Sequence, residues 1–208
     1  MTTPGIERIP RPLAAAPGAG RRNRGHREAV PRAVSNARLG TALFVAAETM
    51  VFAGLVSSFL ILRANASDWP PAGQPRLPVG VTGVNTLVLL ASAFTMVRAA
   101  RAAKEPGHAA GRYLRLTGLL GSVFLLVQGI EWARLMGFGL TAASSNFGAA
   151  FYTLIGCHGV HVAGAVLALE VLRRRHARGE AVALDALQLY WLFVVAVWPI
   201  LYVLVYLG

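Results

Sequence analysis

Five stretches of this chain are long and apolar enough to cross a lipid bilayer as α-helices. Each carries either no charged residue or one glutamate, and about 20 apolar residues let a helix span a hydrocarbon core of roughly 30 Å. The stretches are residues 39–62, 77–97, 116–133, 147–169 and 186–208. Buried helices of a large soluble protein would need polar outer faces elsewhere in the chain, and there are none. The sequence therefore predicts an all-α fold, an integral membrane bundle of five transmembrane helices within residues 38–208.

The composition agrees with a bilayer environment and excludes several function classes. Charged residues make up 14% of the chain, against about 25% in globular proteins. The net charge of +11 is high, but the basic residues lie in blocks between long uncharged runs and not along one folded face, so nucleic acid is not an expected partner. The single cysteine, Cys157, excludes an internal disulfide framework and a cysteine-rich metal site.

Residues 1–37 differ in kind from the rest of the chain. Up to Arg38 there are eight arginines and five prolines, with few residues that could form a core, so we expect a disordered, solvated arm on the cytoplasmic side. Contact with anionic lipid headgroups is one possible role for it. The apolar patch at 13–16 is too short for a secretory signal and is followed by Pro17 and further charges.

Basic residues are distributed unevenly over the segments that connect the helices. The N-terminal arm and the links at 98–115 and 173–178 together hold 17 of them on one side of the predicted membrane, whereas Arg63, Arg76 and Arg134 lie on the other. Lysine and arginine favour the cytoplasmic side. We therefore expect a multi-pass protein of the bacterial inner (plasma) membrane, with a cytoplasmic N-terminus and a periplasmic or external C-terminus.

Four ionisable side chains lie inside the predicted helices, where they are expensive to bury and are functional candidates by default. They are Glu48, Glu131, His158 and His161. At ~1.5 Å of rise per residue, Glu48 lies ~15 Å and His161 ~18 Å from the cytoplasmic helix ends, while His158 lies ~22 Å and Glu131 ~28 Å from them. Hydrogen bonds from Glu48 to His161 and from Glu131 to His158 are both geometrically possible. Arg134 is an alternative partner for Glu131.

These four groups do not match a known redox or catalytic centre. Two histidines on one face of one helix cannot hold a haem from opposite sides, and a di-iron site needs about four carboxylates and two histidines from four helices. We expect no catalytic residue and no bound metal or haem in this chain. A polar network that fixes helix register, or a role toward a lipid or a proton, stays open.

Small and aromatic residues predict how the helices pack and where they end. Trp69, Pro70 and Pro71 predict a short rigid cap at the membrane interface. Small residues let the backbones of neighbouring helices approach closely in a membrane. The glycines expected to do so are Gly118, Gly121, Gly156, Gly159 and Gly164.

At the level of motifs, the chain resembles subunit III of haem–copper terminal oxidases (cytochrome c oxidase and its quinol-oxidising relatives), in the five-helix form that lacks the first two helices of the seven-helix form. The resemblance covers about residues 38–208 in the family's order. Its motifs are AETMVF at 47–52, WPP at 69–71, VNTLVLLAS at 84–92, QGIEW at 128–132, GCHGVHV at 156–162, and YW at 190–191 with VW at 197–198.

This resemblance implies a subunit without redox centres of its own. Haem and copper would lie in partner subunits, subunit I being the main contact, with subunit II and a small subunit IV as further partners. The subunit would bind phospholipid and support proton uptake and durability during turnover. The proton and lipid network would consist of Glu48, Glu131, His158 and His161. The lipid or interface residues would be Arg63, Trp69, Asn85, Trp132, Tyr190, Trp191 and Trp198.

One helix departs from the family pattern and keeps alternatives open. The family often has histidine and aspartate where this chain has Leu192 and Val195. A nitric-oxide-reductase-associated homologue is therefore the nearest alternative, and a small membrane transporter or scaffold is an alternative of another class. A transporter should show broken helices or inverted repeats. Pro199 is expected to kink the helix at 186–208, but no second broken segment matches it. The electron donor, cytochrome c or quinol, stays open as well.

The distribution of basic residues predicts the result of a labelling experiment. In a Cys157→Ala background, a single cysteine placed beside Arg174 should stay unmodified by a membrane-impermeant thiol reagent in intact cells, because positive residues favour the cytoplasmic side. A cysteine beside Trp69 should react. The opposite pattern would reverse the predicted orientation.

Overall fold

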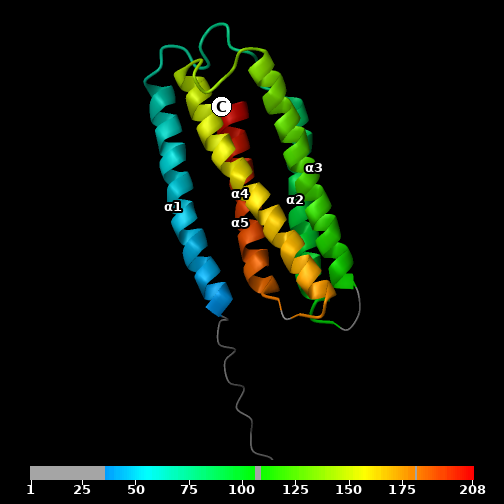
Figure 1. The fold of residues 1–208 in the computed structure, drawn as a ribbon. Coiled ribbons are helices and arrows are strands. Elements are labelled where there is room, and N and C mark those ends of the chain that lie inside the picture. The colour runs from blue at the N-terminus through cyan, green and yellow to red at the C-terminus, as the bar shows by residue number, and fades with distance from the viewer. Residues whose placement is uncertain (1–35, 106–108, 181) are drawn as a thin grey trace, which may run out of the picture. The chain divides into compact units, whose positions relative to one another are not determined.

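A computed structural model of the chain describes residues 36–105, 109–180 and 182–208. These residues form five long α-helices (Figure 1). The helices are α1 (Asn36–Ala64), α2 (Val79–Ala102), α3 (Ala109–Gly137), α4 (Asn146–Ala177) and α5 (Leu184–Tyr202), which continues as a short π-helix η1 (Val203–Leu207). All five are long and apolar enough to span a membrane. The predicted five-helix, all-α membrane fold is confirmed. The predicted N-terminal arm, as far as residue 35, lies outside the residues that the structure describes.

Most helices extend beyond the uncharged stretches, because charged residues continue a helix outside the hydrocarbon layer. α4 is the clearest case. It begins after Ser145, whose side chain accepts a hydrogen bond of 3.0 Å from the backbone N–H of Gly148 and so caps a free donor of the first turn. It ends beyond a group of arginines, two of which, Arg173 and Arg174, bond to Glu170. α2 instead begins at Val79, after Pro78, two residues later than predicted.

Successive helices run in opposite directions, and α5 packs against α1, α2 and α4 (Figure 1). α2 and α3 form the most extensive pair, and α4 completes the bundle against α3, α5 and α1. The α2–α3 and α4–α5 connections lie at the end where α1 starts, and the C-terminus lies at the opposite end (Figure 1). The links that hold most basic residues of the described chain are therefore gathered at one end of the bundle.

The core lies around the two tryptophans of α5. Trp191 and Trp198 are fully buried, and they are seven residues apart, which places them on one helix face. α1 is the least buried helix, since only Phe52 and Phe59 of its 29 residues are buried. Leu55 and Val56 are partly buried against the core, and many of its remaining apolar side chains are exposed, as expected of a helix in contact with lipid or with another subunit.

Small residues allow the closest helix contacts, as predicted for two glycines of α3. A Cβ atom at Gly121 would lie 2.7 Å from the Trp191 ring, and one at Gly118 would lie 2.9 Å from Leu169. Gly159 makes room for Trp132 in the same way, at 3.2 Å, and Gly156 lies 3.9 Å from that ring. The prediction is wrong for Gly164, which faces outward, since a Cβ atom at this position would have no neighbour within 4 Å.

We predict that Gly121→Ala lowers the thermal stability of the purified protein in detergent. The added methyl group has no space against the rigid Trp191 ring, and overpacking of this kind costs about 1–3 kcal/mol. Gly129→Ala on the same helix is the matched control, because nothing lies within 4 Å of its Cβ position. Equal melting temperatures for the two variants would contradict this packing.

Candidate functional site: polar side chains inside the bundle

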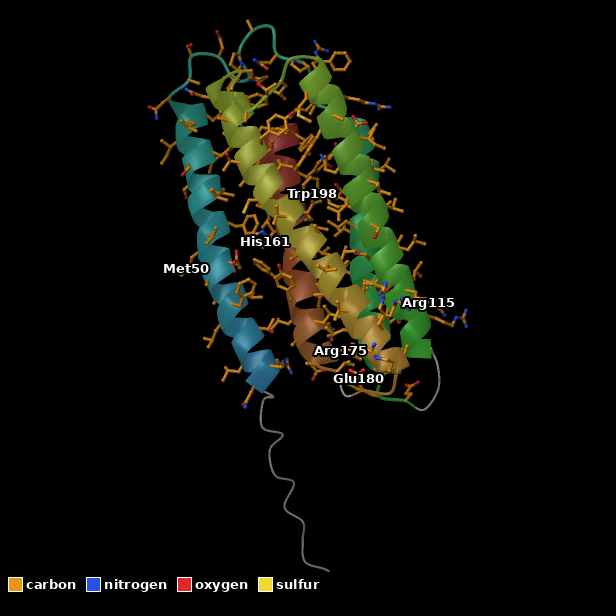
Figure 2. The ribbon with its side chains drawn as sticks, in the orientation of Figure 1. Met50, Arg115, His161, Arg175, Glu180 and Trp198 are labelled. Carbon is orange, nitrogen blue, oxygen red and sulfur yellow. The ribbon has the colours of Figure 1, made fainter. Side chains whose placement is uncertain are left out.

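Glu48 of α1 and His161 of α4 form the predicted hydrogen bond between these helices. Their Oε2 and Nε2 atoms are 2.9 Å apart, and both side chains are mostly buried, with 17% and 16% of their surface exposed. Figure 2 shows His161 on the side of α4 that faces α1. Phe52 packs edge-on against the His161 ring at 5.2 Å and helps to exclude water from the pair.

The other ring nitrogen of His161 limits the protonation states that this pair can adopt. Nδ1 lies 2.7 Å from the carbonyl oxygen of Cys157, and because a carbonyl only accepts, Nδ1 must carry a hydrogen. A neutral His161 can then only accept at Nε2, so that Glu48 must be protonated. If Glu48 is ionised, His161 must carry both protons. In either state a single proton lies between Glu48 and His161, and the pair has no net charge.

Glu131 does not bond to His158, and its partner is the alternative one, Arg134. The guanidinium of Arg134 donates to Glu131 Oε1 at 2.7 Å. Glu131 is buried, whereas the Arg134 side chain is 64% exposed. Glu131 and Arg134 are one turn apart on α3, so this local ion pair forms in place of the hydrogen bond between Glu131 and His158. Glu131 therefore lies near the end of the bundle, where Arg134 reaches the surface.

His158 lies in the centre of the bundle among aromatic rings. It is 1% exposed and stacks on Trp198, with ring centroids 5.0 Å apart and planes at 27°. Phe124 and Phe52 approach its edge. Within the described residues, neither ring nitrogen of His158 has a hydrogen-bond partner. His158 and His161 share a helix face and both contact Phe52, but of the two only His161 has a hydrogen-bond partner in the described chain.

A second set of polar contacts, which the sequence did not predict, joins α2 to α5. The indole of Trp191 donates to Ser92 Oγ at 3.1 Å, and that of Trp198 donates to Thr86 Oγ1 at 2.8 Å. Each hydroxyl in turn donates to a carbonyl of its own helix. One feature of the sequence could have indicated these bonds. The two tryptophans are seven residues apart, and small hydroxyl residues recur at a similar spacing on α2.

Further side-chain contacts join α3 to its neighbours. Asn85 of α2, predicted as an interface residue, donates to the carbonyl oxygen of Phe124 at 3.0 Å. Gln128 donates to the hydroxyl of Tyr206 in η1, also at 3.0 Å. These are buried bonds between residues far apart in the sequence, and they fix the rotation of each helix toward its neighbour.

The remaining predicted interface residues are distributed over both ends of the bundle. Trp69 packs edge-on against Phe59 and Phe147, at 5.4 and 5.2 Å, so it caps the end where the α1–α2 connection lies. Arg63 lies in the last turn of α1, beside Gly208 at the C-terminus. Trp132 packs on Tyr152. Tyr190 packs on Phe44 near the opposite end.

The residues that depart from the family pattern lie in an apolar part of α5. Val195 is buried and Leu192 is partly buried. Residues 36–105, 109–180 and 182–208 contain no group of three or more His, Cys, Asp or Glu side chains that could hold a metal ion.

Comparison with known proteins gives the family. The family described as cytochrome c oxidase subunit III matches residues 22–208. The chain belongs to the cytochrome c oxidase subunit III family. It is 37% identical over 175 residues to cytochrome c oxidase subunit 3 of Synechocystis sp., covering 81% of this chain and 74% of that protein. It is 38% identical over 180 residues to the Bacillus subtilis subunit, covering 83% and 86%.

A third relative extends the match further. A probable cytochrome c oxidase subunit 3 of Nocardia farcinica is 34% identical over 198 residues, which cover 91% of this chain and 95% of that protein. The resemblance predicted from the motifs is therefore confirmed. As a member of the subunit III family, the chain is a multi-pass membrane protein related to a subunit of the respiratory oxidase complex.

The α2–α5 contacts of this subunit III homologue predict a measurable coupling. Thr86→Val and Trp198→Phe each remove one side of the same hydrogen bond, so the double variant should lose less stability than the two single losses added together. Such couplings in membranes average about 0.6 kcal/mol and reach about 1.7 kcal/mol. The measurement is a double-mutant cycle on the unfolding free energy in mixed detergent micelles.

The matched control for this cycle pairs Thr86→Val with Trp191→Phe. Trp191 bonds to Ser92 and not to Thr86, so these two losses should add. Additive losses in both cycles would mean that the Thr86–Trp198 bond does not stabilise the fold.

Proposed function

We propose that this chain is the non-redox subunit III of a respiratory haem–copper oxidase complex, which reduces O2 in aerobic electron transport and couples this reaction to proton translocation. The match of the subunit III family to residues 22–208 carries the proposal. Haem and copper would be held by partner subunits. The part of this chain is to stabilise subunit I, to hold lipid and to support proton uptake. Under this proposal the chain contributes to the oxidase activity of the complex without a catalytic residue of its own.

The partners of the proposed complex would cover the apolar outer faces of the bundle. Subunit I is the main partner proposed, with subunit II and a small subunit IV as further ones. α1 and α2 present long apolar faces to the outside, formed by Leu43, Phe44, Met50 and Val51 on α1 and by Val81, Val84, Leu87, Leu90 and Phe94 on α2. Such faces suit packing against other transmembrane helices as well as against lipid.

The proposed orientation places the basic end of the bundle in the cytoplasm of a bacterial cell. The α2–α3 and α4–α5 connections lie together at the end where α1 begins (Figure 1). In Figure 2, Arg115 and Arg175 lie toward this end. A gathering of basic residues at one membrane face favours the cytoplasmic side. The C-terminus would then be periplasmic or external.

A phospholipid site is proposed near this basic end. A cavity of about 350 Å³ lies between α1, α4 and α5 and is lined mainly by apolar residues, among them Phe44, Leu172 and Tyr190. An acyl chain fits walls of this kind. Arg175 lies one turn beyond Leu172 on α4, 3.9 Å from the carboxylate of Glu180, and supplies positive charge for a phosphate group. Tyr190 was one of the predicted lipid or interface residues.

In this support of proton uptake a structural role is proposed for the Glu48–His161 pair, with proton transfer as the alternative. The hydrogen bond at Nδ1 of His161 leaves one proton between the two side chains, and a pair of this kind can pass a proton from one partner to the other without a net charge in the membrane. The pair also joins α1, the least buried helix, to α4. We therefore propose that it keeps α1 in place during turnover.

A nitric-oxide-reductase-associated role is the second candidate. The observation that favours it is the apolar character of α5 at Leu192 and Val195, where the family often has ionisable residues. The transporter alternative has no support now that the chain is placed in the subunit III family. Both of the remaining candidates place this chain beside a haem-containing subunit.

Substitutions of Glu48 separate a structural role from a proton-transfer role. An amide keeps much of the hydrogen-bonding capacity of a protonated carboxyl group, so Glu48→Gln should preserve assembly and most initial turnover. Glu48→Ala leaves His161 without its partner at a cost of about 1–3 kcal/mol and should shorten the working life of the complex several-fold. The measurement is oxygen consumption over many turnovers, with the subunit and lipid content determined afterwards.

The control is Glu105→Gln, which changes an exposed carboxylate in the α2–α3 connection and should have no effect. Equal impairment of Glu48→Gln and Glu48→Ala in intact complexes would assign proton transfer to Glu48 and reject the structural role. If neither substitution had an effect, both roles would be rejected.

A further inference from the structure

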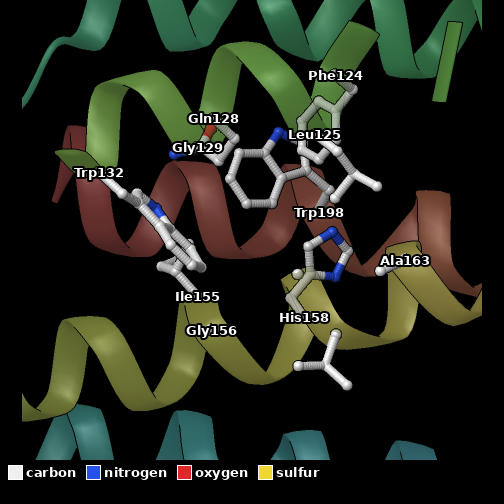
Figure 3. A pocket seen from close by; sticks show the side chains of 12 residues that line it. Phe124, Leu125, Gln128, Gly129, Trp132, Ile155, Gly156, His158, Ala163 and Trp198 are labelled. Atoms are coloured by element: carbon white, nitrogen blue, oxygen red, sulfur yellow. The ribbon is translucent and has the colours of Figure 1, made fainter. Parts of the chain in front are cut away.

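A cavity of about 340 Å³ lies between α3 and α4, near the end of the bundle where α3 begins. The smaller cavity around His158 (Figure 3) has almost entirely apolar walls. The larger one, called the Arg115 cavity below, is lined by three charged side chains, Arg115 of α3 and Glu170 and Arg173 of α4. Arg115 is exposed, and Arg173 and Glu170 are partly exposed. Their charged groups are therefore accessible to a molecule that approaches from the membrane.

Positive charge is in excess around the Arg115 cavity. Glu170 bonds to Arg173 at 2.6 Å and to Arg174 at 2.7 Å, so two guanidinium groups share its negative charge. Arg115 has no hydrogen bond or ion pair to any residue that the structure describes. Three arginines thus face one carboxylate, and the two surplus positive charges need a counter-charge that the side chains around the cavity do not supply.

The cavity has a charged end and an apolar end. The 29 residues of α3 give a length of ~43 Å, close to the ~40–45 Å of a bilayer with its headgroups. Arg115 lies ~9 Å from the start of α3 and Arg173 ~6 Å from the end of α4, near the boundary between headgroups and hydrocarbon. Leu119, Val166 and Ser122 continue the lining inward, and Ser122 is ~10 Å deeper than Arg115. The cavity therefore extends from the headgroup level into the hydrocarbon layer.

A ligand that matches both ends has an anionic headgroup and an acyl chain. Guanidinium groups bind phosphate through charge-assisted hydrogen bonds, and basic pockets between transmembrane helices suit anionic headgroups. The ammonium group of a zwitterionic lipid finds no vacant carboxylate, because Glu170 already bonds to two arginines. An acidic protein segment would match the charges but not the inner end, which lies at hydrocarbon depth between two transmembrane helices.

We propose that the Arg115 cavity binds one anionic phospholipid, with its phosphate at Arg115 and Arg173 and an acyl chain along Leu119 and Val166. The lipid supplies the missing negative charge, so the site distinguishes anionic from zwitterionic phospholipids. It is separate from the phospholipid site proposed between α1, α4 and α5, and it does not depend on the proposed role of the chain in an oxidase.

Photoreactive lipids test this site in the full-length protein, purified with its partners and reconstituted in phosphatidylcholine vesicles. Two probes carry a diazirine at the same position near the carboxyl end of the acyl chain, and one is a phosphatidylglycerol and the other a phosphatidylcholine. Peptide mass spectrometry should find labelling by the first within residues 114–122 and 166–173, displaced by unlabelled phosphatidylglycerol. It should exceed labelling by the second at least about fivefold, the effect of one arginine near the headgroups. Equal labelling, or none because a partner subunit covers the cavity, would overturn the proposal.

Two arginines of α3 provide matched variants for the headgroup. Arg115→Gln removes the unpaired charge of the cavity and should weaken the binding of phosphatidylglycerol about fivefold. Arg112→Gln removes the same charge from an exposed position one turn away that does not line the cavity, and it should leave binding unchanged. Equal weakening by both substitutions would mean a general attraction to the basic end of the bundle and would overturn the site.

Two serines provide matched variants for the acyl chain. Ser122→Leu fills the inner end of the cavity and should abolish the excess of phosphatidylglycerol labelling. Ser57→Leu places the same side chain on the exposed side of α1 and should keep that excess. An excess retained in a folded Ser122→Leu protein would contradict the proposed position of the chain.

Inorganic phosphate separates a lipid site from a site for the free ion. It is added before illumination, with sodium chloride at the same ionic strength as the control. The phosphate should leave the labelling of residues 114–122 and 166–173 unchanged, because it cannot occupy the apolar end. Displacement of the lipid by phosphate but not by chloride would assign the cavity to the free ion and overturn the proposal.

Discussion

The hydrocarbon layer offers no hydrogen-bond partner, so each polar group of this chain that lies in the layer must find one within the protein or in a ligand. The backbone meets this requirement by forming five helices. The side chains meet it by bonding across the helix contacts, as Glu48 does with His161 and Thr86 with Trp198. Helix rotation and register depend on these bonds, because apolar side chains alone pack on lipid as well as on one another.

α5 and the π-helix η1 that follows it make several of these connections. Trp191 and Trp198 bond to α2, and Tyr206 in the π-helix accepts a hydrogen bond from Gln128 of α3. Pro199 has no backbone N–H to donate to the carbonyl four residues earlier in the helix, and a π-turn follows it. A π-turn has a wider helical register than an α-helix and so changes the direction in which the following side chains point. The C-terminal turn thereby holds Tyr206 inside the bundle and not at its lipid face.

The number, type and approximate position of the helices followed from the uncharged stretches, because the bilayer restricts the possible structures so strongly. The Glu48–His161 pair also followed, since similar depths in an antiparallel bundle limit the choice of partners. The Glu131–His158 pair did not form, because depth says nothing about helix rotation and Arg134 competes from only one turn away. The bonds of Thr86 and Ser92 were not predicted, because a small hydroxyl that also bonds to its own helix leaves little trace in the sequence.

The polar network of this subunit lies within its own helices, and we propose that the chain holds no redox centre and works beside subunits which hold haem and copper. The most direct measurement is a haem spectrum of the tagged chain purified from its native membrane, recorded before and after the chain is separated from its partners. We expect haem absorption in the intact preparation, together with co-purified oxidase subunits, and none in the separated chain. A chain that purifies alone without haem, or one that keeps a stoichiometric haem after separation, would contradict the proposed role.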